Sequence, residues 1–273
     1  AVGGTHFAVY NRAGNELTIC SRTRTLYSQS FDAGILLCAM SNNNSLAVVT
    51  ESGRYAAQVQ VFDPSLHLLY SWEMTQSAGT PIALDFSPDS RRFAAGMLSA
   101  QEGQLSCSVY FMSMDANAEG PVYTADQGSM LLRLDWQSER RVMAVFDTYL
   151  AVLDPTTGTE TARYDYGGAA LQSVAPGRRQ TALLLTVRGG NNLVTLSETL
   201  TPMAEIPARQ AFGVSATDTD IYLLCPDAVE CYGYDGVQNW VYSDLASRPL
   251  AVVNAAKPLL LTGSRAEVLE GGS

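Results

Sequence analysis

Histidine, clustered basic residues and long apolar runs are all scarce in this sequence. Only His6 and His67 occur among 273 residues, so there is no HExxH zinc motif. The 17 lysines and arginines are scattered and outnumbered by 27 aspartates and glutamates, giving a net charge of −10. Nucleic-acid phosphates are held by clustered basic side chains, so a nucleic-acid partner is not expected. No apolar run approaches the ~18 residues of a membrane-spanning helix, so this segment itself is expected to make no membrane contact.

The sequence also lacks the motifs of common metal, cofactor and catalytic sites. The five cysteines, at positions 20, 38, 107, 225 and 231, form no CxxC pair and no zinc-binding spacing. A disulfide between Cys225 and Cys231, which flank the turn PDAVE, stays open, although free thiols are favoured. The stretch DANAEG (115–120) lacks the ligand spacing of a calcium loop, and no GxSxG nucleophile motif occurs. We therefore predict no metal ion, no cofactor and no catalytic residue.

Apolar residues are plentiful, and they follow a strand-like pattern. The chain is 47% hydrophobic and 16% charged, which is typical of a folded protein with a sizeable core. Around LDFSPDSRRFAAG (84–96), PIALDF (81–86) reads as a strand, SPDS as a tight turn and RRFAAGML (91–98) as a second strand. LSCSVYFMS (105–113) and GPVYT (120–124) read as the third and fourth. No helix is predicted, because an apolar spacing of two dominates.

This four-strand unit recurs along the chain. Complete units cover 34–74, 81–124, 130–166, 170–208 and 211–242. With Ile35, Ile82, Leu131, Leu171, Phe212 and Leu250 as equivalent residues of the first strand, successive spacings are 47, 49, 40, 41 and 38 residues. Propeller blades repeat every ~40–50 residues, whereas a β-sandwich places seven to nine strands in ~100 residues with no such repeat. The sequence thus predicts an all-β propeller of four-stranded antiparallel blades.

The two ends of the chain decide the expected number of blades. Three strand-like segments precede residue 33 (THFAVYN, ELTICSR and TLYSQSF), and three follow residue 248 (PLAVVN, PLLLTGS and AEVLE). Six blades would leave two apolar strands without a sheet, whereas seven leave two blades one strand short. We prefer seven blades, with six as the alternative. They would form a single domain, residues 1–273, closed by the N- and C-terminal strands.

Several of these segments resemble known propeller repeats. LDFSPDSRRFAAG resembles the FSPDG-type turn of WD40-like and TolB-like propellers. The segments VFDPSLHLLYSW (61–72), VLDPTTGTETARY (152–164) and YGYDGVQNW (232–240) resemble repeats of the quinoprotein (PQQ-like) superfamily. Trp72 and Trp240 occupy the outer-strand Trp position of those repeats, and Tyr164 replaces it in another blade. The adjacent cysteines of quinoprotein dehydrogenases and the Gly-His and Trp-Asp dipeptides of WD40 proteins proper are missing.

The whole chain is also similar to an uncharacterised propeller family of clostridia-type gut bacteria that carries an N-terminal membrane anchor. This resemblance implies a bacterial, extracytoplasmic protein at the cell surface, anchored by a segment upstream of Ala1. It adds nothing about activity, because a propeller fold hosts many functions.

A non-catalytic binding or scaffold propeller is the function we expect, with a protein or a glycan as partner. Loops between second and third strands, and those that join one blade to the next, emerge on one face and form a polar rim. The expected binding residues on this face are Glu51, Arg54, Gln101, Glu102, Asp147, Tyr149, Arg188, Asn191, Asn192, Asp227 and Arg248. That these are only solvated turns is the competing interpretation.

The alternative function is a glycan- or quinone-handling enzyme with carboxylates near the propeller axis. Asp85 lies inside an apolar first strand, and Asp135 occupies the same position in the next unit. A structural role is favoured for both, as short side chains that accept backbone N–H groups at a strand end. Trp136 takes the place of Phe86 and is expected to pack in the core rather than stack on a ligand.

Overall fold

Short antiparallel strands make up the structure, a computed structural model that describes all residues except 102, 116–119, 244, 246, 254–256 and 270–273. The described residues form seven sheets and no helix. The first sheet contains β1 (His6–Tyr10), β2 (Glu16–Ser21) and β3 (Thr25–Ser30). The last contains β24 (Pro249–Val253), β25 (Leu259–Thr262) and β26 (Ala266–Val268).

The five sheets between them have four strands each, which confirms the five complete units. The second and third sheets are β4 (Ile35–Met40), β5 (Leu46–Thr50), β6 (Ala57–Phe62), β7 (Leu68–Met74), and β8 (Thr80–Phe86), β9 (Arg92–Gln101), β10 (Gln104–Ser113), β11 (Val122–Thr124). The fourth is β12 (Leu131–Ser138), β13 (Arg141–Phe146), β14 (Tyr149–Asp154), β15 (Thr159–Asp165). The fifth and sixth are β16 (Ala170–Ala175), β17 (Thr181–Val187), β18 (Gly190–Leu196), β19 (Pro202–Pro207), and β20 (Gly213–Ala216), β21 (Asp220–Leu224), β22 (Val229–Gly233), β23 (Gln238–Tyr242). In every sheet the strands lie side by side in the order of the sequence.

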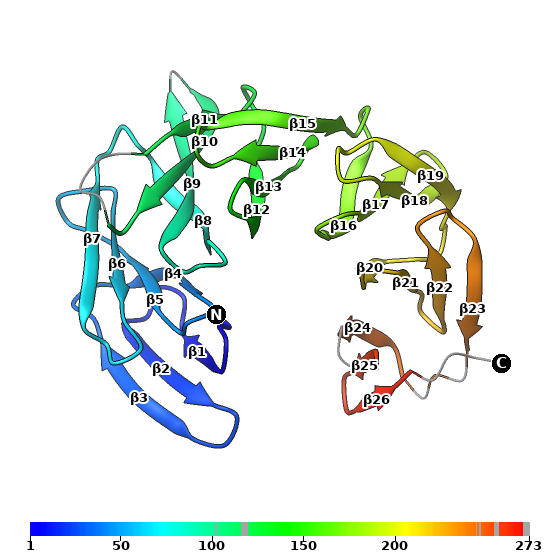
Figure 1. Cartoon of the computed structure of the whole chain (residues 1–273), viewed down its shortest axis with the longest axis horizontal. Helices are drawn as coiled ribbons and strands as arrows, with labels where there is room; N and C mark the ends of the chain where they lie inside the picture. Colours follow the sequence, from blue (N-terminus) through cyan, green and yellow to red (C-terminus); the bar gives the residue numbers. More distant parts are fainter. Residues whose placement is uncertain (102, 116–119, 244, 246, 254–256, 270–273) are drawn as a thin grey trace. The chain divides into compact units, whose positions relative to one another are not determined.

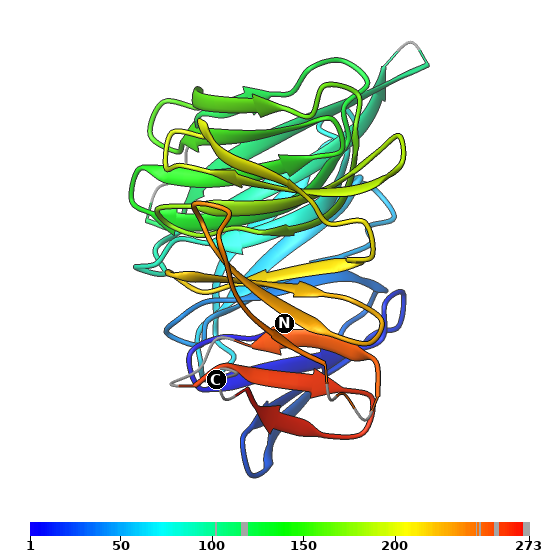
Figure 2. The same cartoon turned by 90° about the vertical axis from the view of Figure 1, so that its right-hand side faces the viewer.

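The chain divides into two compact units, which are described separately. Unit 1 comprises Ala1–Asp147 and Ala151–Thr161, and unit 2 comprises Thr148–Leu150 and Ala162–Ser273. Within unit 1, the sheets β1–β3, β4–β7 and β8–β11 follow one another in the order of the chain (Figure 1). Within unit 2, β16–β19, β20–β23 and β24–β26, drawn in green to red, do the same (Figures 1 and 2).

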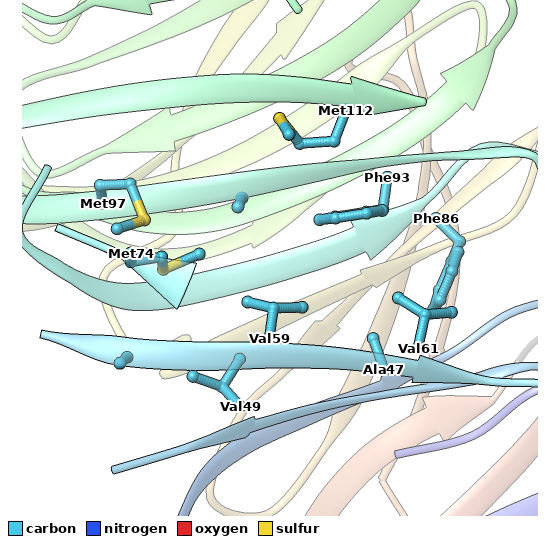
Figure 3. Close-up of a cluster of buried hydrophobic side chains, with 11 residues drawn as sticks. Ala47, Val49, Val59, Val61, Met74, Phe86, Phe93, Met97 and Met112 are labelled. Carbon is cyan, nitrogen blue, oxygen red and sulfur yellow. The ribbon is translucent and has the colours of Figure 1, made fainter. Parts of the chain in front are cut away.

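Within each unit, neighbouring sheets bury apolar side chains against one another, as β4–β7 and β8–β11 do in unit 1 and β16–β19 and β20–β23 do in unit 2. Between β4–β7 and β8–β11, Val59, Met74, Phe93 and Met97 are almost fully buried and point toward one another (Figure 3). The Phe93 ring lies 5.8 Å from that of Tyr70 in an edge-to-face contact. Neither sheet could hide these residues from water alone, so the sheets stabilise each other.

The SPDS turn ends the innermost strand through side-chain hydrogen bonds to the backbone. Ser87 Oγ accepts the Arg92 N–H at 2.9 Å, and Asp89 Oδ1 accepts the Arg91 N–H at 3.1 Å. Ser90 adopts φ 60°, a left-handed conformation that closes the turn. Ser41 takes the place of Ser87 one sheet earlier and accepts the Ser45 N–H at 2.9 Å. Segments of different sequence therefore form the same turn, because each has a short oxygen-bearing side chain at the equivalent position.

Candidate functional site

The predicted binding residues that the structure describes lie in or beside two kinds of loop, which leave the sheets at the same strand ends. Antiparallel pairing places second-to-third strand loops and sheet-to-sheet loops at the same strand ends, here called the loop face of each unit. In unit 1 this holds for Glu51, Arg54, Gln101 and Asp147, and in unit 2 for Tyr149, Arg188, Asn191, Asn192, Asp227 and Arg248. Glu102 lies outside the described residues. The predicted rim is thus divided between the two units.

A hollow of about 400 Å³ in unit 1, here called the acidic hollow, contains one of these residues, Glu51. It lies where the loop after β3 meets the ends of β5 and β6 and extends along β6. Its lining residues are Gln29, Ser30, Phe31, Asp32, Ala33, Thr50, Glu51, Gln58, Gln60 and Phe62.

Backbone hydrogen bonds fix the loop that forms this hollow. The Phe31 N–H donates to the Asn15 carbonyl at 2.8 Å, and the Glu51 N–H donates to the Gly34 carbonyl at 2.9 Å. A Cβ on Gly34 would lie 3.1 Å from Glu51 Oε2, so glycine leaves room for the carboxylate beside the backbone. The loop is therefore held at both ends, and the Glu51 carboxyl group has a defined place next to it.

Charge in the acidic hollow has one sign. Asp32 and Glu51 are exposed carboxylates, and none of the ten lining residues is basic. Gln58 and Gln60 add amide groups, with the Gln58 amide donating to Ser71 Oγ at 3.2 Å. The rings of Phe31 and Phe62 are 6.0 Å apart, edge to face. The site combines acceptors, amides and an apolar wall, as ligand pockets commonly do.

A second hollow of about 400 Å³ occupies the equivalent connection one sheet further along, also in unit 1. It is lined by Ala56, Gln76, Ser77, Gly79, Thr80, Leu98, Ser99 and Ala100. None of these residues is charged, so we call it the neutral hollow. Gly79 adopts φ 92°, and a Cβ there would lie 2.4 Å from the Leu98 carbonyl oxygen. The backbone of the loop before β8 thus approaches β9 more closely than any other residue would allow.

The remaining predicted residues of unit 1 lie outside both linings. Arg54 is exposed in the loop after β5, with its guanidinium 5.5 Å from the centre of the Tyr55 ring. Asp147 accepts the Met130 N–H at 2.8 Å through Oδ1, which ties two neighbouring connections together. Gln101 pairs with Gln104 at the end of the β9–β10 hairpin.

In unit 2 several predicted residues make internal contacts. Tyr149 is 1% exposed, and the Arg163 guanidinium lies 3.6 Å from the centre of its ring. Asn191 donates to the Ala211 carbonyl at 2.6 Å, and Asn192 donates to Glu205 at 2.8 Å. The Arg248 guanidinium lies 4.0 Å from the centre of the Phe212 ring. Arg188 and Asp227 are exposed in their loops.

The structural role predicted for Asp85 is confirmed. Its Oδ1 accepts the Phe86 N–H at 2.9 Å, and its Oδ2 accepts the Trp136 N–H at 2.6 Å. Burial, partly offset by the bond from Trp136, raises the pKa of Asp85 to about 6. Asp135 accepts the Gln137 amide at 3.1 Å. Trp136 is 5% exposed and packs edge to face on Phe111, as expected for a core residue.

Cys225 and Cys231 are both buried free thiols. Cys231 pairs with Tyr222 across the hairpin, so the two cysteines do not face each other. Burial raises the pKa of each thiol to about 11. In the part of the chain that the structure describes, no three histidine, cysteine, aspartate or glutamate side chains gather as a metal site would require. Nor does any helix there have the length and hydropathy to cross a bilayer.

Repeated four-stranded antiparallel sheets that bury their faces on one another define the β-propeller class. Solved structures support this assignment. The computationally designed Ika8 protein is similar with a TM-score of 0.68 and 12% identity, over 93% of this chain and 79% of that one. The WD40 domain of Neurospora crassa Pan2 is similar with a TM-score of 0.63 and 10% identity, over 95% of this chain and 84% of that one. BamB from Moraxella catarrhalis is similar with a TM-score of 0.59 and 14% identity, over 95% of this chain and 81% of that one.

At such identities these neighbours confirm the propeller fold and nothing beyond it. The chain belongs to a family of unknown function, DUF5711, which matches residues 1–196. No curated protein sequence matches it.

Most lining residues of the acidic hollow were missed in the sequence, although a signal was present. In β6, Gln58, Gln60 and Phe62 alternate with buried Ala57, Val59 and Val61, so they share the face opposite to the one packed on β8–β11. Two glutamines on one face of an otherwise apolar strand could have indicated a wet surface. Asp32 could be added only once the loop after β3 was known to meet that face.

Proposed function

We propose that this protein is a non-catalytic binding propeller whose partner docks on the loop face of unit 1. The observation that carries the proposal is the pair of hollows, each about 400 Å³, at equivalent connections of successive sheets. Their size falls within the ~300–1,000 Å³ range of ligand sites. Loops on a rigid scaffold can change without disturbing the strands, so they are where a propeller acquires binding specificity.

The geometry favours binding over catalysis. Hydrolysis of a glycan would need two carboxylates converging on a pocket, ~5–9.5 Å apart. The pair considered for this role, Asp85 and Asp135, directs its carboxylates to hydrogen bonds with the Trp136 backbone and the Gln137 side chain. The first contact joins the inner strands β8 and β12, the second lies within β12, and both carboxylates are thus used inside the protein.

The proposal includes a closed ring of seven blades formed by residues 1–273 as one domain. It is supported by the seven sheets, and by apolar side chains exposed on both terminal sheets: Phe7 and Val9 in β1, and Leu250 in β24. Covering them would remove this apolar area from water. Small-angle X-ray scattering should give a radius of gyration of about 18–19 Å, the value for a compact domain of this length. A clearly larger radius would contradict closure.

The location follows from the family resemblance and is part of the same proposal: display outside the cell. Protease treatment of intact cells that express the full-length gene tests this. The propeller should be digested while a cytoplasmic marker protein remains whole. If the propeller and the cytoplasmic marker both survive the protease, the propeller lies inside the cell and the proposed location is wrong.

Binding is tested with random-peptide display and a glycan array, screened against the protein and a variant that fills both hollows. Ala33→Trp together with Ala100→Trp places a large side chain in each lining. Glu198→Trp, in an exposed turn of unit 2, is the matched control. Ligands selected on the native protein should bind the Glu198→Trp control and should not bind the filled variant. The melting temperature of the filled variant must be unchanged for this comparison to be valid. Equal binding to all three proteins would disprove the loop face of unit 1 as the docking surface.

A further inference from the structure

The acidic hollow contains two carboxylates that have no partner within the described part of the chain. The carboxylates of Asp32 and Glu51 take part in no salt bridge and accept no hydrogen bond there, in contrast to Asp63 and Asp154, which cap turns. Both are exposed, and both line a cavity rather than a convex surface. Their negative charges are available to a ligand.

The other groups of the hollow suit an organic cation. The amides of Gln58 and Gln60 offer carbonyl oxygens beside the carboxylates, and Phe31 and Phe62 provide an apolar wall. A guanidinium or ammonium group has donors only, with an apolar stem that can lie along such a wall. An anionic ligand would meet two like charges and no basic lining residue.

The size of the hollow argues for a side chain rather than a bare metal ion. A calcium ion needs six to eight oxygen ligands at ~2.3–2.6 Å, usually with several carboxylates. Two carboxylates in about 400 Å³ do not form such a cage, whereas the volume suits the end of an arginine or lysine.

The neutral hollow extends this surface. The loop after β5 separates the two hollows, because Glu51 at its start lines the first and Ala56 at its end lines the second. The second lining combines small and polar residues such as Ser77, Ser99 and Ala100. A chain that places a cation in the first hollow can therefore lay an uncharged segment in the second.

From these contacts we infer that the acidic hollow binds the arginine or lysine side chain of an extended partner polypeptide, whose uncharged neighbouring residues occupy the neutral hollow. This inference rests on the proposed binding function of the loop face, and it names the chemical class of the ligand. The two carboxylates attract the cation, and the second hollow selects a chain over a free amine.

The test compares two blocked peptides that differ in one charge, acetyl-Gly-Ala-Arg-Ala-Gly-amide and its citrulline analogue, by calorimetry and by amide chemical shifts. The arginine peptide should bind at least several-fold more tightly, and the difference should shrink in high salt. Asp32→Asn and Glu51→Gln should each weaken it about three-fold and together about ten-fold, leaving the citrulline peptide unaffected. Glu198→Gln is the matched control, since it removes one exposed carboxylate from unit 2.

Two results would overturn the inference. If the arginine and citrulline peptides bind equally well, the acidic hollow does not select a cationic side chain. The binding function would still stand if the selected ligands fail to bind the filled variant. If spermidine or calcium chloride displaces the bound arginine peptide as effectively as the unlabelled peptide does, the ligand need not be an extended polypeptide, and that part of the inference is wrong. If the filled variant retains every ligand, the proposed function itself fails.

Discussion

The Asp85 carboxylate in β8 accepts the backbone N–H of Trp136 in β12 at 2.6 Å, so an acidic side chain joins the inner strands of two successive sheets. The inner strand of each sheet has a free edge, and its N–H groups need acceptors. Similar links recur: Ser173 accepts the Val214 N–H at 3.2 Å, and Ser215 accepts the Val252 N–H at 3.3 Å. Oxygen-bearing side chains thus satisfy the edges that the stacking of sheets leaves open.

Ionisation of Asp85 should make stability depend on pH. Its pKa is about 6 in the folded protein against an ordinary 3.8, so folding favours the protonated form. The protonated Asp85 side chain makes its full contribution to stability below pH 3.8, and this contribution is lost as the pH rises through 6. The free energy of unfolding should change by at most about 3 kcal/mol over this range. Urea unfolding of the native protein and of the Asp85→Asn variant between pH 4.5 and 7.5 measures this pH-dependent part of the unfolding free energy.

The difference in unfolding free energy between these two proteins should change with pH, in favour of the native protein at acidic pH. Glu198→Gln supplies the control, because it removes an exposed carboxylate instead of a buried one. A difference for Asp85→Asn that does not change with pH would show that burial does not raise this pKa.

The SPDS turn should contribute measurably to stability through Ser87. Ser87 is 1% exposed, and its hydroxyl bonds to both the N–H and the carbonyl of Arg92, each at 2.9 Å. Ser87→Ala removes the acceptor of the Arg92 N–H, while the Arg92 carbonyl keeps its bond from the Ser87 N–H, and it should cost about 1–3 kcal/mol of unfolding free energy. Ser65→Ala, in the exposed turn between β6 and β7, should cost less than about 0.5 kcal/mol. Chemical denaturation that shows equal losses would contradict the role assigned to the Ser87 hydroxyl.

Packing between β4–β7 and β8–β11 predicts the effect of a core truncation. Phe93 is fully buried and contacts the rings of Tyr70 and Phe86. Phe93→Ala should lower the free energy of unfolding by about 3–5 kcal/mol, because it leaves a cavity that the sheets cannot close. Leu69→Ala, at a residue that is 52% exposed, should change it by less than about 0.5 kcal/mol. Similar melting temperatures for the two variants would contradict this packing.

Much of the fold could be predicted from the sequence, and much less of the site. Strand position depends on local alternation and turn residues, so the five complete units and the three strands at each end were confirmed. Residues that line a hollow depend on which strand faces which loop. Glu51 was found because it lies in a loop between a second and a third strand, whereas Asp32, in the loop after β3, and Gln60, in β6, share no local pattern. The buried position of Tyr149 under Arg163 is likewise a contact between strands, invisible in either segment alone.

The first sheet should be essential to unit 1, because it covers the neighbouring sheet. Ala8, Leu17 and Ile19 of β1 and β2 share a buried cluster with Leu46 and Val48 of β5. Removal of residues 1–30 would expose that face. At ~25 cal/mol per Å² of apolar area, several hundred Å² correspond to a loss on the order of 10 kcal/mol, comparable to the stability of a whole domain. A chain of residues 31–273 should therefore aggregate or unfold, as gel filtration and thermal melting would show. A monomer with an unchanged melting temperature would prove that β1–β3 do not stabilise the rest of the propeller.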